Sequence, residues 1–245
     1  PVAPDRCLRI LHDMKEEEIG LYPTEDSYAF LIGAYSMRGR AEEAEQVLSD
    51  MLEPEEGIPL EPNLHAYNGV VRAWCRSRAA DAPVRYLGLL RQMKYKGPKP
   101  DINTYNTVIG ALGRRGLADR AERVLRAMMV DNEKKNSNVV PNLVSFNSVM
   151  KAWSESDVPG AADQCIRLLH EMKEKRIDPT ADSYLVVIRA LSKSVAVDAP
   201  DRCKQLLNEM KGCGLKPNKD IYRVLREIYA KHDRQEDFQR LIPRP

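Results

Sequence analysis

The sequence predicts an all-α protein, a right-handed α-solenoid (superhelix) of helix-turn-helix repeats, and two observations predict it. A proline followed five residues later by an aromatic residue recurs at a nearly constant period along the 245 residues. Between these points apolar residues follow the spacing of amphipathic helices, each about a dozen residues long and too short to be stable alone in water. Short helices repeated at this period bury their apolar faces by stacking on neighbouring copies.

The repeat is defined by its proline and its aromatic residue. The pairs are Pro23/Tyr28, Pro62/Tyr67, Pro100/Tyr105, Pro141/Phe146, Pro179/Tyr184 and Pro217/Tyr222, and the period from one proline to the next is 38 to 41 residues. We therefore expect a single array: the second helix of a partial repeat at 1–24, full repeats at 25–63, 64–101, 102–142, 143–180 and 181–218, and a partial terminal repeat at 219–245. Because the chain opens within a repeat and without an initiator Met, we expect it to be a piece of a longer protein.

The first helix of each repeat is expected to begin just after the proline. Proline cannot extend the preceding helix, and the next residue has a short side chain that can accept a backbone N–H at a helix start. These capping candidates are Thr24, Asn63, Asp101, Asn142, Thr180 and Asn218. Local turn chemistry and long-range period thus predict the same helix starts.

The second helix of each repeat ends in a leucine followed three residues later by a methionine. The pairs are Leu11/Met14, Leu48/Met51, Leu90/Met93, Leu125/Met128, Leu169/Met172 and Leu207/Met210. At this helical spacing methionine is expected to fill the core. Cys7, Cys165 and Cys203 share one repeat position with Ala44 and Ala121, which predicts small buried side chains there. Without a C-x-x-C motif, free thiols in a reducing compartment are expected.

Composition and motifs argue against several classes of function. The 38 basic and 36 acidic residues nearly balance, at a net charge of +2, so any nucleic-acid binding must depend on particular positions. No apolar run approaches the roughly 18 residues of a membrane span. The histidines show no catalytic or metal-binding arrangement, and Gly110 and Gly113 fall inside a helix rather than a phosphate-binding loop. We expect no enzyme activity, metal, cofactor, membrane or small-molecule substrate.

Three adjacent repeats place an asparagine immediately after the aromatic residue. These are Asn68, Asn106 and Asn147. One explanation is capping of the first helical turn, although each repeat already has a capping candidate after its proline. The other explanation is that the amides face a groove, where each offers a donor and an acceptor to the edge of a base.

The chain resembles the pentatricopeptide repeat (PPR) family through the run P-D-I-N-T-Y-N-T-V-I-G-A-L-G-R-R-G and the following A-x-x-V-L-x-x-M. The resemblance extends over nearly the whole chain. It implies that each repeat reads one base of single-stranded RNA, using the residue after the aromatic and the residue after the closing proline. The implied base-reading pairs are Asn68 with Asp101 for uracil, and Asn106 with Asn142 and Asn147 with Thr180 for pyrimidines.

The outer repeats depart from the family pattern. Ala29 and Leu185 stand where the amide is expected, beside Asn63 and Asn218. The family usually sandwiches each base with an aliphatic residue near the helix start, and of the residues there only Val144 fits, with His65 and Asn103 as further candidates. Asp26 and Asp182 take this position in the outer repeats, where an acid would repel the RNA backbone.

Basic residues gather at the ends of the first helices. The candidates for phosphate contact are Arg76, Arg114, Arg115 and Lys193. A favourable interaction with the helix C-terminus explains the same residues equally well.

The resemblance thus implies sequence-selective binding of single-stranded RNA, on a short pyrimidine-rich run, in organellar RNA processing, stability or translation. It also implies a location in the mitochondrion or chloroplast. A protein-interaction scaffold with the same fold and no RNA readout is the alternative, and protein partners stay open. A third alternative is an RNA-processing enzyme whose catalytic domain lies outside these residues.

Overall fold

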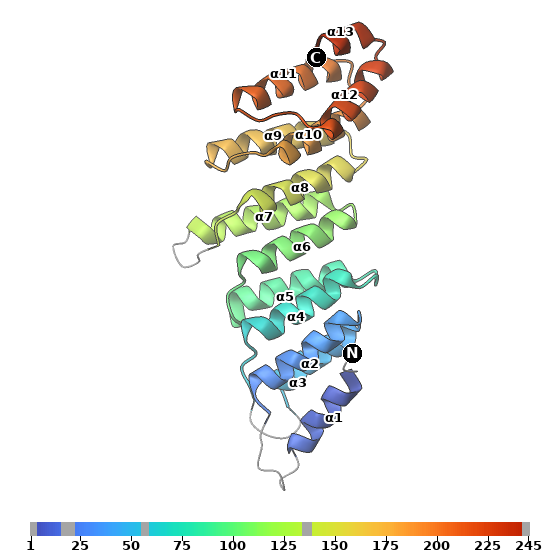
Figure 1. The fold of residues 1–245 in the computed structure, drawn as a ribbon. Helices are drawn as coiled ribbons and strands as arrows, with labels where there is room; N and C mark the ends of the chain where they lie inside the picture. The colour runs from blue at the N-terminus through green and yellow to red at the C-terminus, as the bar shows by residue number, and fades with distance from the viewer. Residues whose placement is uncertain (1–3, 16–22, 55–58, 134–138, 242–245) are drawn as a thin grey trace. The chain divides into compact units, whose positions relative to one another are not determined.

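The computed structural model describes residues 4–15, 23–54, 59–133 and 139–241, which form helices and no strand (Figure 1). The helices are α1 (Pro4–Lys15), α2 (Glu25–Met37), α3 (Ala41–Leu52), α4 (Leu64–Arg76), α5 (Ala82–Lys96), α6 (Ile102–Arg114), α7 (Ala118–Glu133), α8 (Leu143–Glu155), α9 (Ala161–Glu174), α10 (Ala181–Lys193), α11 (Ala199–Gly212), α12 (Lys219–Lys231) and α13 (Gln235–Leu241). The predicted all-α fold is confirmed. Parts of the two partial repeats expected at 1–24 and 219–245 lie outside the described residues.

The chain divides into two compact units, and each is described by itself. The first comprises residues 1–111 and 131–139, and the second comprises residues 112–130 and 140–245. In the first unit α4 packs against α2, α3 and α5, and in the second α10 packs against α8, α9, α11 and α12 (Figure 1). Within each unit, therefore, the first helices of successive repeats lie side by side, and each also packs on the second helices before and after it.

All six predicted capping residues cap a helix. Thr24, Asn63, Asp101, Asn142 and Asn218 accept the backbone N–H of the third residue after them at 2.7 to 3.4 Å. Thr180 forms a capping box with Ser183, whose hydroxyl accepts the Thr180 N–H at 3.1 Å. Gly116 lies in the turn that follows α6, with a φ of 69° that favours glycine.

The core consists largely of the residues that recur with the repeat. Fully buried members are Tyr67, Tyr105, Phe146, Tyr184, Met51, Met93, Met128, Met172 and Met210. The described cysteines, at 7, 75, 165, 203 and 213, form no disulfide, and burial raises the pKa of the Cys165 and Cys203 thiols to about 12. The shared small position is buried at Cys165, Cys203, Ala44 and Ala121, but Cys7 is only half-buried.

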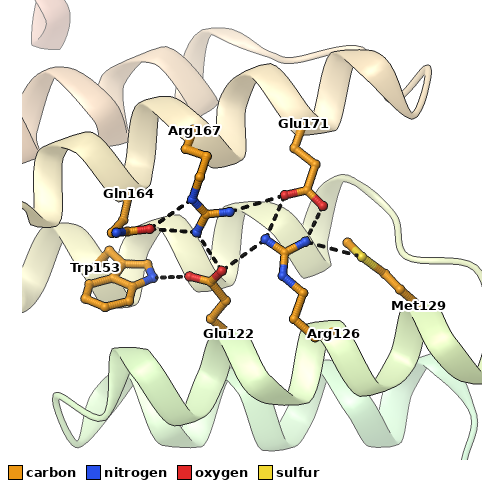
Figure 2. A network of polar contacts seen from close by, with 7 residues as sticks. All are labelled: Glu122, Arg126, Met129, Trp153, Gln164, Arg167 and Glu171. Carbon is orange, nitrogen blue, oxygen red and sulfur yellow. Dashed lines mark hydrogen bonds and ion pairs between the residues drawn. The ribbon is translucent and has the colours of Figure 1, made fainter.

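Polar contacts between successive repeats of the second unit converge on one carboxylate (Figure 2). The indole N–H of Trp153 on α8 donates to Glu122 on α7 at 2.9 Å. Arg126 and Arg167 donate to the same carboxylate at 3.0 and 2.6 Å, and both also bind Glu171 on α9. This Glu122 network ties α7, α8 and α9 together. Burial opposes ionisation of Glu122, yet the hydrogen bonds from Arg167, Arg126 and Trp153 lower its pKa.

A simpler version of this contact joins two repeats of the first unit. The indole N–H of Trp74 on α4 donates to Glu45 on α3 at 2.9 Å. Arg85 on α5 lies 3.7 Å from the same carboxylate and 5.5 Å from the centroid of the Trp74 ring. In both units the indole N–H of a tryptophan on a first helix thus donates a hydrogen bond to a glutamate of the preceding second helix.

Candidate nucleic-acid interface

The buried aromatic residue of each first helix sets the direction of the asparagine that follows it. Successive residues of an α-helix are rotated by about 100° around its axis. Because Tyr67 and Phe146 point into the core, Asn68 and Asn147 lie to one side of it and are half-buried. Asn106 is half-buried beside Tyr105 in the same way. The predicted amides are therefore half-buried rather than packed in the core.

The structure brings together the first predicted base-reading pair. The Thr104 hydroxyl at the start of α6 lies 2.5 Å from Oδ1 of Asn68 on α4 and 2.6 Å from Oδ1 of Asp101. Asp101 also accepts the Thr104 backbone N–H at 2.7 Å and the Asn103 amide N–H at 3.4 Å. Two side chains from different repeats thus share one hydroxyl. We call Asn68, Asp101 and Thr104 the first cluster.

Asp101 is held in its ionised form within the first cluster. Its partial burial opposes ionisation, but hydrogen bonds from Thr104, Asn103 and Asn68 outweigh this effect, so the pKa of Asp101 is lowered. A carboxylate with several donors on one side keeps lone pairs on the other. The cluster therefore offers acceptor oxygens beside an amide group.

The second unit holds a groove of about 820 Å³ between the first helices α8, α10 and α12. Asn147 and Thr180, another predicted base-reading pair, both line it, and so does the exposed Val144, the predicted aliphatic residue of the base sandwich. Oδ1 of Asn147 is buried and accepts no hydrogen bond within the described part of the chain. Three predicted site residues therefore share one cavity.

Both cations and the acidic residues Glu155, Asp182 and Glu227 line the same groove. Lys193, predicted to contact phosphate, lies in it together with Arg189, one helical turn earlier on α10. Neither side chain forms an ion pair with any of the described residues, whereas Lys151 lies 3.8 Å from Glu155 and Arg223 lies 3.0 Å from Asp220. Arg189 and Lys193 are thus available to an anionic ligand.

One row of basic residues was not predicted from the sequence. Arg72, Lys151 and Arg189 each stand ten residues after the proline of their repeat, and all three are exposed on first helices. Their fixed repeat position is a signal that the sequence contains. They lie before the last helical turn, whereas the predicted cations lie at the helix ends.

The other predicted site residues lie on the surface of first helices or at their starts. Arg76 and Arg114 are exposed in the last turns of α4 and α6, Arg115 follows half-buried, and His65 and Asn103 are exposed near the helix starts. Asn106 belongs to the first unit, and Asn142, which caps α8, belongs to the second. The pairing of these two residues stays a prediction.

The first full repeat presents a different surface. Ala29, which replaces the amide, is buried, and the Asn63 amide donates to Asp26 at 3.0 Å. Phe30 and Met37 lie two turns apart on α2, with 72% and 80% of their surface exposed. Leu185, the other replacement, is also buried. Neither outer repeat offers a base-reading amide.

No metal-binding cluster of three or more His, Cys, Asp or Glu occurs within residues 4–15, 23–54, 59–133 and 139–241. Over these same residues, the helices fall short of the length and apolar character that crossing a membrane requires.

The chain is similar to known families and proteins along much of its length. A family model of the pentatricopeptide repeat domain matches residues 88–156, and a model of the PPR repeat matches residues 26–53. A pentatricopeptide repeat-containing protein of Arabidopsis thaliana is 33% identical over 125 residues, which cover 51% of this chain and 21% of that protein. A chloroplastic pentatricopeptide repeat-containing protein of the same plant is 28% identical over 158 residues, covering 64% and 19%. The chain thus spans about a fifth of these relatives.

Two solved structures share the fold. The crystal structure of the pentatricopeptide repeat protein PPR10 from maize matches with a TM-score of 0.69 at 24% identity, covering 97% of this chain and 31% of that one. The PPR domain of Arabidopsis thaliana protein-only RNase P 1, solved in complex with tRNA, matches with a TM-score of 0.61 at 14% identity, covering 81% and 95%. These two structures share the fold, and the repeat pattern and the two family models identify the chain as a pentatricopeptide repeat protein.

Proposed function

We propose that this chain binds single-stranded RNA along the faces of its first helices and prefers a short pyrimidine-rich run. The observation that carries the proposal is the first cluster. Asn68 and Asp101, which the resemblance pairs as readers of one base, stand 33 residues apart in the sequence and meet at the hydroxyl of Thr104. An amide beside a carboxylate supplies the donor and the acceptors that a base edge requires.

The second unit supports the same function with a groove for the strand. Asn147 and Thr180 lie in it with Val144, and the unpaired Arg189 and Lys193 supply positive charge for phosphates. The exposed Arg72 in the first unit occupies the same repeat position as Arg189. Base-reading groups and cations therefore occur together, as single-stranded RNA requires.

Similar proteins support RNA binding and a location in an organelle. The PPR domain of protein-only RNase P 1 was solved in complex with tRNA, and several relatives in Arabidopsis thaliana are chloroplastic by name. We propose that the full-length protein acts in an organelle, in RNA processing, stability or translation. Imaging the full-length protein with a C-terminal fluorescent tag would test the location, and a signal confined to the cytosol would contradict it.

Binding to RNA oligomers tests the function directly. We expect oligouridylate and oligocytidylate to bind more tightly than oligoadenylate of the same length, with an affinity that falls as salt rises. Asn68→Ala should weaken binding of oligouridylate by about tenfold, since one lost polar contact costs about 1.4 kcal/mol. Asn208→Ala, on the exposed side of the second helix α11, is the matched control and should bind like the wild type.

A protein partner is the second candidate, and the first full repeat favours it. Its exposed Phe30 and Met37 form an apolar surface on α2, and its Asp26 would repel a phosphate. If the chain is a protein-interaction scaffold, RNA binding should show no steep salt dependence, and Asn68→Ala should not change it. Either result in the oligomer experiment would favour the scaffold over the proposed RNA binding.

A further inference from the structure

We propose that Thr104 is a positioning residue whose hydroxyl fixes the Asn68 amide and the Asp101 carboxylate, so that the first cluster distinguishes uracil from cytosine. The inference rests on the proposed RNA binding. Thr104 is buried at the start of α6, one repeat further along the chain than Asn68. Its hydroxyl touches both members of the pair, at 2.5 and 2.6 Å.

The hydroxyl carries a single hydrogen between two acceptor oxygens. It can donate to Asn68 Oδ1 or to Asp101 Oδ1, but not to both at once. An amide oxygen has two lone pairs, so Asn68 Oδ1 keeps one for a donor supplied by the ligand whether or not it receives this hydrogen. Uracil presents an N–H at position 3 of its ring, whereas cytosine presents a lone pair there, which these oxygens would repel. The cluster therefore favours uracil.

Helix capping does not require this hydroxyl. Ala66 and Ile221 occupy the same repeat position in α4 and α12, where Asn63 and Asn218 accept their backbone N–H groups at 3.0 and 2.9 Å. The Thr104 backbone N–H likewise donates to Asp101. A repeat can thus start its first helix without a side-chain hydroxyl at this position, which leaves the contact with Asn68 as the distinctive role of Thr104.

The corresponding residue of the second unit behaves differently. Ser183 stands in the place of Thr104, but its hydroxyl accepts the Thr180 N–H at 3.1 Å and lies 3.3 Å from the Thr180 hydroxyl. Oδ1 of Asn147 has no hydrogen-bond partner among the described residues. No hydrogen bond to Oδ1 from the described residues fixes which end of the Asn147 amide meets a base, so we expect this repeat to accept uracil and cytosine alike.

Substitution of Thr104 separates positioning from folding. Thr104→Val keeps the branched shape and the backbone N–H but removes the hydroxyl, and Thr104→Ser keeps the hydroxyl. Thr104→Ala, which copies Ala66, is a second variant without the hydroxyl. Thr107→Val on the same helix is the control, since it removes a hydroxyl outside the cluster. Circular dichroism would confirm that each variant is folded.

The readout is the ratio of dissociation constants for oligocytidylate and for the same oligomer with one uridine at successive positions. For the wild type we expect a ratio of about tenfold at one position. Thr104→Val and Thr104→Ala should lower it to below about threefold, while Thr104→Ser and Thr107→Val keep it. An equal loss of affinity for both oligomers, with the ratio unchanged, would overturn the proposal. Failure of the wild type to bind any RNA would instead refute the proposed function itself.

Discussion

Asn68 and Asn147 occupy the same position in their repeats, yet their surroundings differ. Asn68 meets the Thr104 hydroxyl and the ionised Asp101, whereas Oδ1 of Asn147 lies buried without a partner in the described part of the chain. The difference begins with the residue after the closing proline. At Asp101 the Thr104 hydroxyl lies within hydrogen-bond distance of both the carboxylate and the Asn68 amide oxygen, whereas the Thr180 hydroxyl pairs with that of Ser183. Equal positions in a repeat therefore do not ensure equal recognition.

The polar contacts that hold the helices of Asn68 and Asn147 against neighbouring repeats also differ, and here the helix of Asn147 has more of them. Near Asn147 the Glu122 network holds α8 through Trp153 and two arginines, and near Asn68 the Glu45 contact holds α4 through Trp74 and one more distant arginine. The side chain of Glu122 is 14% exposed and that of Glu45 is 30% exposed. The polar cluster around Asn68 in the first unit is thus better defined than the surroundings of Asn147. The Glu122 network of the second unit, in turn, joins successive repeats more strongly than the Glu45 contact of the first unit.

Loss of the Glu122 carboxylate should give the largest effect. Glu122→Ala leaves the Trp153 indole without its acceptor and removes one of the two carboxylates that bind Arg126 and Arg167, and we expect a loss of about 2–4 kcal/mol in the free energy of unfolding. The matched Glu45→Ala removes a more exposed acceptor and should cost about 1 kcal/mol. Urea denaturation followed by circular dichroism would measure both losses. Equal losses for the two variants would show that the Glu122 network and the Glu45 contact stabilise the fold equally.

A methyl group at Gly69 should have the next largest effect, because Gly69 adjoins Asn68 at a close approach of two helices. The added Cβ of Gly69→Ala would lie 2.6 Å from Cγ2 of Ile32, so we expect a loss of about 1–3 kcal/mol. Gly33→Ala meets nothing within 4 Å and should stabilise α2 by about 0.5–1 kcal/mol. Thermal unfolding of the two variants checks the opposite signs. A stabilised Gly69→Ala variant would contradict the close packing of α2 on α4.

The sequence predicted the features that depend on local chemistry and on the repeat period. The helix starts after the prolines, the caps at Asn63 and Asn142 and the buried Met93 all follow from residue type and spacing. The half-buried position of Asn68 follows from its place beside a core tyrosine. Such features require no knowledge of how one repeat is placed on the next.

Contacts between repeats could not be predicted in this way. The bond from Trp74 to Glu45 depends on how α4 is rotated against α3. The different partners of the Thr104 and Ser183 hydroxyls depend on side-chain torsion angles that a short polar residue can satisfy in several ways. A repeat period specifies which residues are equivalent, but not which of two nearby acceptors each one chooses.

A substitution that makes the pair Asn147 and Thr180 resemble the pair Asn68 and Asp101 is expected to have a smaller effect, on RNA binding. Thr180→Asp places a carboxylate beside Ser183 and Asn147, as Asp101 lies beside Thr104 and Asn68. We expect the preference for uridine over cytidine at this repeat to rise by about threefold to tenfold, which corresponds to about 1 kcal/mol. Binding to oligocytidylate with one uridine at successive positions would reveal a second preferred position. Thr180→Asn, which adds an amide without a charge, is the control, and an equal rise with it would show that charge is irrelevant.

Removal of the Asp101 charge, which the corresponding Thr180 lacks, is expected to have the smallest effect, on the stability of the fold. Hydrogen bonds keep the pKa of Asp101 below its ordinary value of 3.8, despite partial burial, so the ionised form stabilises the folded state. This contribution is present above pH 3.8 and is lost as the pH falls through the lower pKa of the folded state. Asp101→Asn retains a capping side chain, as Asn142 does in α8, but removes the charge at the start of α6.

At neutral pH we expect Asp101→Asn to be less stable than the wild type by about 0.3–1 kcal/mol, the usual value of a carboxylate at a helix N-terminus. The difference should shrink below pH 3.8, because the wild-type carboxyl then becomes neutral as well. Urea midpoints of both proteins between pH 7 and about pH 2.5 would measure it. A difference that stays constant with pH would mean that the charge of Asp101 does not stabilise the fold.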